Sequence, residues 1–190
     1  MKRPRIVLAA LLAAGGCAFS RGSASISDAG AALDRNVAAT EAIDRWEPLP
    51  AAAARRLTSE YGIPDEVTKT SLSWSNIGPW RRIVVRDVPP PAVPGTDAGI
   101  IEQAVGYSMT PAQSADLAAF DARLAFNPRS QELSARSDRE ELNFLRLNLA
   151  DDVVHQRLSP VQARKSYYRE VEFDAAGMSE PQLHALLLTP

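Results

Sequence analysis

An N-terminal export signature limits which part of this chain can form a folded domain. A basic start leads into an apolar run from Ile6 to Ala14, and Cys17 follows as the only cysteine of the 190 residues. The run is about nine residues long, whereas a membrane-spanning helix needs about 20, so we interpret residues 1–16 as a cleaved signal peptide. A single cysteine allows no internal disulfide, and the core alone must therefore hold the exported domain together.

The residues next to Cys17 resemble the cleavage site of bacterial lipoproteins. Leu12 to Cys17 reads LAAGGC, and in that class a run of small residues is cut directly before the cysteine. The resemblance implies acyl chains on Cys17, which give an effectively permanent membrane anchor, and an exported protein that faces the periplasm. Ala18 follows, where lipoproteins retained at the inner membrane of enteric bacteria have Asp, so the resemblance favours the outer membrane. Alternatively, an ordinary signal peptidase cuts nearby and Cys17 carries no lipid.

The charge of the mature chain excludes one class of partner. Removal of Lys2, Arg3 and Arg5 with the signal leaves 18 Lys and Arg against 23 Asp and Glu, a formal net charge of −5. The sequence also has no run of basic residues interleaved with aromatic residues. We therefore expect no nucleic-acid partner.

We predict a single α+β domain between two short terminal segments. Residues 17–27 read CAFSRGSASIS, and these small and polar residues predict a lipidated tether with a reach of roughly 15–20 Å. Residues 28–178 suffice for one domain with a sizeable core, and residues 179–190 are expected to form a C-terminal tail. Within the domain, helices are expected to pack on a small antiparallel sheet built from hairpins.

The first half of the domain predicts two helices followed by a hairpin. Apolar residues at helical spacing indicate one helix that ends near Trp46 and a second over residues 51–61, just before Gly62. The period then changes to two, which predicts strands over residues 67–74 and 80–87 on either side of a turn.

A proline-rich segment, Pro89 to Gly95, separates this hairpin from the second half. Proline lacks the amide donor that a sheet requires, so the segment is expected to be a stiff extended connector. We prefer a surface crossover within one domain to a linker between two domains, because residues 36–87 alone would have only two strands for their helices to cover.

The second half begins with a strand, a helix and another hairpin. Residues 100–109 have no single clear period, and a strand is favoured over residues 104–109. Thr110 then caps a helix that reaches about residue 119. The hairpin is expected from residues 122–126 and 131–136, which are joined by a turn that contains proline.

Two helices complete the predicted domain. Ser137 and Glu140 match a capping box that opens a helix to about residue 156. The buried stripe of this helix is predicted to be Leu142, Leu145, Leu149 and Val153. Ser159 opens a last helix, to about residue 172, in the same manner.

Signals for catalysis are weak. Gly106 to Thr110 reads GYSMT, which lacks the second glycine of the GxSxG nucleophile elbow. Neither histidine, His155 or His184, has a recognisable catalytic context. Asp152 and His155 have a spacing that could face one metal ion, but a histidine that ends a helix and pairs with Asp151 or Asp152 is the simpler interpretation. We therefore expect no metal and no cofactor, and we favour a non-enzymatic role.

A group of polar residues around the second hairpin and the following helix is more unusual. Its members are Glu132, Ser134, Arg136, Asn143 and Asn148. One hypothesis is a buried hydrogen-bond network that fixes the helix on the sheet, and the other is the floor of a polar pocket near Glu132, Arg136 and Asn143. Trp74 and Trp80, on either side of the first predicted turn, are either core residues or, if exposed, an adhesive binding surface.

Two further resemblances carry little functional information. The string YGIPDEVT from Tyr61 and the string NFLRLNL from Asn143 resemble a group of uncharacterised bacterial exported proteins, as do Trp74, GPW at 78–80 and ELSAR at 132–136. That group implies no activity. The succession of helix, Gly-x-Pro, Trp-bearing strand, turn and strand is similar to small lipoproteins of the outer-membrane β-barrel assembly machinery.

Together these features predict a lipid-anchored cell-envelope protein with a binding or scaffolding role, and with an envelope protein as its partner. One alternative is an envelope-located hydrolase, which a deep polar pocket with two convergent carboxylates would favour. The other is a carrier of a small ligand, which a large apolar cavity would favour.

Overall fold

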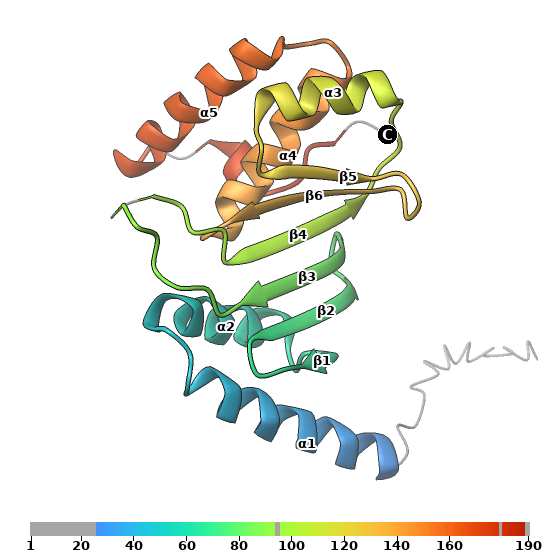
Figure 1. Cartoon of the computed structure of the whole chain (residues 1–190), viewed down its shortest axis with the longest axis vertical. Coiled ribbons are helices and arrows are strands. Elements are labelled where there is room, and N and C mark those ends of the chain that lie inside the picture. Colours follow the sequence, from blue (N-terminus) through green and yellow to red (C-terminus); the bar gives the residue numbers. More distant parts are fainter. Residues whose placement is uncertain (1–25, 94–95, 179, 189–190) are drawn as a thin grey trace, which may run out of the picture.

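The computed structural model describes residues 26–93, 96–178 and 180–188, which form one α+β domain around a six-stranded antiparallel sheet (Figure 1). This architecture confirms the predicted fold class. The predicted signal peptide and Cys17 lie outside the described residues. Within the described ranges, no helix has both the length and the apolar character needed to cross a membrane.

The helices and strands follow the predicted order, with a two-residue strand and a short 3-10 helix in addition. Their bounds are α1 (Ile26–Ile43), α2 (Pro48–Tyr61), β1 (Glu66–Val67), β2 (Ser71–Ile77), β3 (Trp80–Arg86), β4 (Ile101–Gly106), α3 (Pro111–Phe120), β5 (Leu124–Asn127), β6 (Glu132–Ser137), α4 (Glu140–Val154), α5 (Pro160–Ala175) and η1 (Pro181–Leu183).

The strand order β1-β2-β3-β4-β6-β5 confirms both predicted hairpins, β2–β3 and β5–β6. Strand β4 lies between them and pairs antiparallel with β3 and with β6. The proline-rich segment therefore joins two adjacent strands, β3 and β4, of one sheet. It is a crossover within the domain, as the sequence predicts, although Pro94 and Gly95 lie outside the described residues.

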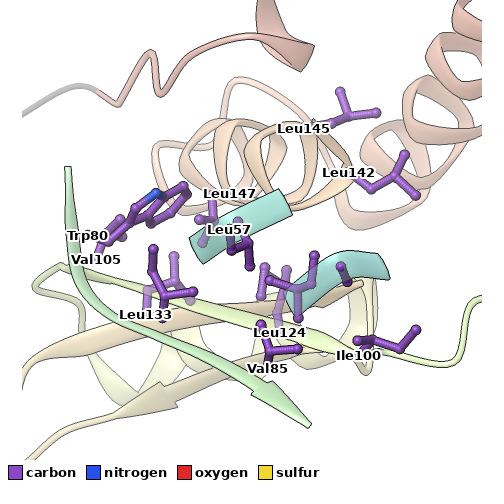
Figure 2. Close-up of a cluster of buried hydrophobic side chains, with 14 of the residues drawn as sticks. Leu57, Trp80, Val85, Ile100, Val105, Leu124, Leu133, Leu142, Leu145 and Leu147 are labelled. Carbon is purple, nitrogen blue, oxygen red and sulfur yellow. The ribbon is translucent and has the colours of Figure 1, made fainter. Parts of the chain in front are cut away.

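Helices α2 and α4 pack on the same face of the sheet, which we call the covered face. Figure 2 shows Leu57 of α2 and Leu147 of α4 beside Trp80 of β3, and all three side chains are buried. Side chains alternate between the two faces of a strand, so Ile83 and Ile101 point into the same core. The core is thus a layer of aliphatic and aromatic side chains between two helices and one sheet.

The first predicted strand starts later than expected. Strand β2 begins at Ser71, and a turn joins it to β1, because the backbone N–H of Thr68 donates to the carbonyl of Ser71 at 2.9 Å. Thr68 and Thr70 therefore lie exposed in the turn, whereas Leu72 and Trp74 are buried as predicted. Threonine is common in strands, but its hydroxyl can also hydrogen-bond to nearby backbone groups and so stabilise a turn. At Thr68 and Thr70 the chain forms the turn.

The capping box predicted at Ser137 and Glu140 is wrong. Ser137 is the last residue of β6, and its buried hydroxyl accepts a hydrogen bond from the Arg146 guanidinium instead of capping a helix. Helix α4 begins at Glu140, whose side chain turns into the core. The predicted stripe of Leu142, Leu145, Leu149 and Val153 is nevertheless buried.

The domain extends beyond residue 178, where the sequence analysis placed its end. Leu183 of η1 is fully buried, and Asn148 of α4 holds the segment around it. The Asn148 amide donates to the carbonyls of Gln182 and Ala185 at 3.1 and 2.8 Å, and its oxygen accepts from the Leu187 N–H at 2.7 Å. Asn148 therefore has a structural role, because its three hydrogen bonds fix the C-terminal segment on α4.

Candidate functional site

Two consecutive residues of β4 show how differently the two faces of the sheet are built. Gln103 points to the covered face, where its amide donates to Glu140 and accepts from Asn143 at 2.9 Å. Glu102 points the other way, to the face that we call the open face, where its carboxylate binds arginines of β3 and β6. In Figure 1 no described helix lies in front of strands β2 to β4.

Glu140 is the centre of a polar network on the covered face. One of its carboxylate oxygens accepts from the Tyr61 hydroxyl at 2.6 Å, from the Trp80 indole at 3.1 Å and from the Gln103 amide. Burial raises the pKa of the Glu140 carboxyl, and it outweighs the opposite effect of the hydrogen bonds from Tyr61 and Gln103. The network joins α2, β3, β4 and α4, so its role is to fix the two helices on the sheet.

The open face carries a cluster of three arginines around one glutamate. Arg82 binds one oxygen of Glu102 at 2.8 Å, while Arg86 and Arg136 bind the other at 3.0 and 2.7 Å. We call Glu102 and these three arginines the arginine cluster. Strand register builds it, because Arg136 and Val84 lie directly opposite Glu102, and Arg82 and Arg86 stand two residues to either side of Val84.

The arginines keep Glu102 ionised although it is almost fully buried. Burial by itself raises the pKa of the Glu102 carboxyl, but the hydrogen bonds from Arg136 and Arg82 and the charge of Arg86 outweigh it and lower the pKa to about 2. With one negative and three positive charges, the cluster has a positive excess at any pH above this value. The arginine side chains are 36%, 38% and 52% exposed, so their remaining N–H groups face solvent.

A shallow hollow of about 220 Å³ adjoins the cluster beside Arg136. Glu102, Arg123 and Ser134 also line it. Arg123 is held by Asp97, to which its guanidinium lies within 3.5 Å. The positive groups thus lie over β3, β4 and β6. Acidic side chains on this face occur at the β1 edge, where Glu66 reaches Ser73 at 3.4 Å, and at the start of β6, where Glu132 lies opposite Gly106.

The polar pocket predicted near Glu132, Arg136 and Asn143 is not formed by these residues together. Arg136 belongs to the open face, whereas Asn143 is fully buried on the covered face and donates to the Ile101 carbonyl at 3.1 Å. Glu132 begins β6, opposite Gly106, and is four residues from Arg136, about 13 Å along a strand. For Asn143, the hypothesis of a buried hydrogen-bond network is the one that the structure supports.

Trp74 and Trp80 are core residues and not an exposed adhesive surface. Each is about 1% exposed. The Trp74 indole donates to the Gly62 carbonyl at 2.9 Å, and the Trp80 ring packs 5.1 Å from the ring of Phe144. Among the described residues 71–86 of this hairpin, no large apolar side chain is exposed.

His155 ends α4, as the simpler of the two sequence hypotheses states. Its Nδ1 lies 3.3 Å from the Asp151 carboxylate, and Asp152 is bound by Arg157 at 2.6 Å. No group of three metal-binding side chains occurs in the part of the chain that the structure describes. Ser108 follows a strand and precedes a helix, but it does not have the positive φ angle of a strained nucleophile turn.

Glu102, Arg82 and Arg86 were not predicted from the sequence to be members of a site. One signal was available, because WRRIVVRD at 80–87 alternates and thus places Arg82 and Arg86 on the face opposite Ile83 and Val85. Strand β4, which carries Glu102, gave no such signal. The sequence does not specify that β4 lies between β3 and β6. Glu102 could therefore not be assigned to the two arginines before the sheet order was known.

Comparison of the chain with protein-family models, curated proteins and solved structures finds no match.

Proposed function

We propose that this protein is a lipid-anchored protein of the bacterial envelope that binds an acidic segment of another envelope protein through the arginine cluster. The role is non-catalytic. The observation that carries the proposal is the excess of three guanidinium groups over one carboxylate on the open face of the sheet. Such an excess favours a partner with carboxylates, because guanidinium groups bind carboxylates with paired, charge-assisted hydrogen bonds.

Glu102 makes the cluster a suitable binding surface in a second way. Its two oxygens hold all three guanidinium groups close together, and the partner does not have to order three free side chains when it binds. Less loss of side-chain entropy means higher affinity for the same contacts. Ser75, which lies opposite Arg82 on β2, adds an exposed hydroxyl next to the positive groups.

The proposed location rests on the sequence around Cys17. An acyl anchor on Cys17 and a tether of roughly 15–20 Å would keep the domain close to the membrane, and Ala18 favours the outer membrane. Replacement of Cys17→Ser tests this part. We expect the wild-type protein to partition into detergent with an acyl mass increment that the variant lacks, and a wild-type mass without such an increment would exclude lipidation.

A photo-crosslinking residue at Ser75 tests the proposed partner in native membranes. We expect it to capture an envelope protein through an acidic segment, identified by mass spectrometry. The capture should be lost in the double variant Arg86→Gln/Arg136→Gln, which leaves Arg82 as the single partner of Glu102 and makes the cluster neutral. The matched control is Arg45→Gln/Arg55→Gln, which removes two exposed charges near α1 and α2.

Two results would contradict the proposed partner. Capture that is equal in the two double variants would mean that the arginine cluster does not bind it. Crosslinks to phospholipid alone, together with cosedimentation with phosphatidylglycerol vesicles but not with phosphatidylcholine vesicles, would show that the cluster faces the membrane surface instead of a protein.

A further inference from the structure

A second and larger cavity, of about 700 Å³, lies where β4 ends. Residues from β3, the β4–α3 connection, the β5–β6 turn and the end of α4 surround it. Those used below are Arg81, Gly106, Ser108, Val154, His155 and Leu188. The volume is typical of sites that hold small organic molecules. The cavity shares no residue with the arginine cluster, so its function does not depend on the proposal above.

Arg81 is the positive group of this cavity. Among the described residues its guanidinium has neither an ion pair nor a hydrogen bond, in contrast to the three arginines of the cluster. It lies directly against the backbone of Gly106, because a Cβ atom at residue 106 would be only 3.1 Å from Arg81 Nε. Because Gly106 has no side chain, the Arg81 guanidinium can lie directly on the backbone at this position.

Two acidic side chains lie near this end of the sheet, and among the described residues neither forms an ion pair with Arg81. Glu132 is opposite Gly106 on β6 and does not line the cavity. Asp151 is about 1% exposed and does not line the cavity. Its carboxylate accepts from the Tyr107 hydroxyl at 2.5 Å and binds Arg157. The Arg81 guanidinium is thus left for an anion that comes from solution.

Polar and apolar groups in the wall add further contacts. His155 uses Nδ1 with Asp151, at 3.0 Å from its carbonyl, while Nε2 has no partner among the described residues. The exposed Ser108 adds a hydroxyl, and Val154 and Leu188 add apolar surface. A ligand that matches these groups has one anionic end and a short apolar part.

We propose that this cavity binds a small carboxylic acid, with the carboxylate on Arg81 and a short aliphatic part against Val154 and Leu188. The site then gives the domain a ligand-dependent function beside partner binding on the open face. Hexanoate is a suitable probe, because it carries one carboxylate on a short aliphatic chain.

An NMR titration of the full chain carrying Cys17→Ser with hexanoate tests the site. We expect saturable shifts of the backbone amides of Gly106 and His155. Hexanol, with the same chain and no charge, should bind at least about tenfold more weakly. Arg81→Gln should weaken hexanoate binding by about the same factor, and Gly106→Ala should also weaken it, because the new Cβ displaces the guanidinium.

Lys165→Gln is the control, since it removes an exposed positive charge from α5 and should leave hexanoate binding unchanged. A lack of saturable binding, equal affinity of wild type and Arg81→Gln, or amide shifts away from the cavity would each overturn the proposal. Inorganic phosphate that binds as tightly as hexanoate would also contradict it, because the apolar wall would then contribute nothing.

Discussion

The covered and open faces of the sheet each contain a buried glutamate, and the pKa values of the two carboxyls are shifted in opposite directions. On the covered face Glu140 has neutral donors from Tyr61, Trp80 and Gln103, and burial raises its pKa. On the open face Glu102 has three arginines, which lower its pKa to about 2. Both carboxyls are removed from water, so the charge of the partners decides whether the pKa of a buried carboxyl is raised or lowered.

This difference indicates a division of roles between the faces. The covered face is held by side-chain volume and by hydrogen bonds that water cannot replace. The open face is held by ion pairs whose arginines are partly in solvent, and exposed ion pairs contribute little to stability. Substitutions on the covered face should therefore mainly lower the free energy of unfolding, and those of the arginines should mainly change binding.

The largest loss is expected for Leu147→Ala on the covered face. The side chain is fully buried between α4 and the sheet, so its removal loses apolar contact and leaves a cavity (Figure 2). The free energy of unfolding should fall by about 2–5 kcal/mol in urea denaturation. The control is Leu33→Ala, whose side chain on α1 is 62% exposed and whose effect should stay below about 0.5 kcal/mol. Equal effects at both positions would mean that Leu147 is not part of the core.

Glu140→Ala should cost about 3 kcal/mol, because it removes the shared acceptor of Tyr61, Trp80 and Gln103. Only the Trp80 indole keeps a second acceptor, the Tyr61 hydroxyl at 3.1 Å. Glu140→Gln keeps a carbonyl oxygen for these donors and should cost far less. Its stability relative to wild type should also improve as the pH rises above 4.5, because the folded wild-type protein holds a proton that the unfolded chain loses there. Urea denaturation across this pH range measures both effects. If the Ala and Gln variants were equally unstable, the hydrogen bonds would not be the reason.

Glu102→Gln tests the open face, and its pH dependence should have the opposite sign. The folded-state pKa of about 2 lies below the ordinary value of 4.5, so ionised Glu102 stabilises the fold above pH 4.5, and this contribution is lost as the pH falls towards 2. At pH 6 the variant should be less stable than wild type by about 2 kcal/mol, and the difference should disappear near pH 2. A difference that is independent of pH would show that Glu102 is not an ion-pair partner of the arginines.

The smallest stability effect is expected for Arg86→Gln. Its side chain is 38% exposed, and Glu102 keeps Arg82 and Arg136 as partners. We expect a loss of at most about 1 kcal/mol in the unfolding free energy. A loss as large as that of Leu147→Ala would remove the distinction between the two faces.

Local patterns in the sequence were enough to predict most of the fold. The hairpin around Gly78, the capped start of α3 at Thr110 and the buried stripe of α4 depend on residues close in the chain, and all three were found. The wrong capping box at Ser137 has a tertiary cause, because Arg146 takes that hydroxyl from a position nine residues away. The serine-to-glutamate spacing is the same whether the serine caps a helix or ends a strand.

The candidate site was predictable only in part, because it depends on contacts between strands far apart in sequence. Arg136 was singled out, but its partner Glu102 lies 34 residues before it and meets it through the pairing of β4 with β6. Asn143 was also singled out, but it points to the other face of the sheet. Polar character in the sequence identified both residues. Whether each reaches solvent depends on which face of the sheet α4 covers, because Asn143 lies on α4 against that face and Arg136 points to the other.

One experiment on the purified full chain carrying Cys17→Ser tests the division between the faces most directly. It measures the affinity for hexaglutamate and the free energy of unfolding of the same samples, for Arg86→Gln/Arg136→Gln and for Glu140→Ala. We expect the arginine variant to bind at least about tenfold more weakly while it loses less than about 2 kcal/mol of stability. The Glu140 variant should lose about 3 kcal/mol and, while folded, bind hexaglutamate as wild type does. Unchanged hexaglutamate binding in the arginine variant would contradict the assignment of binding to the open face.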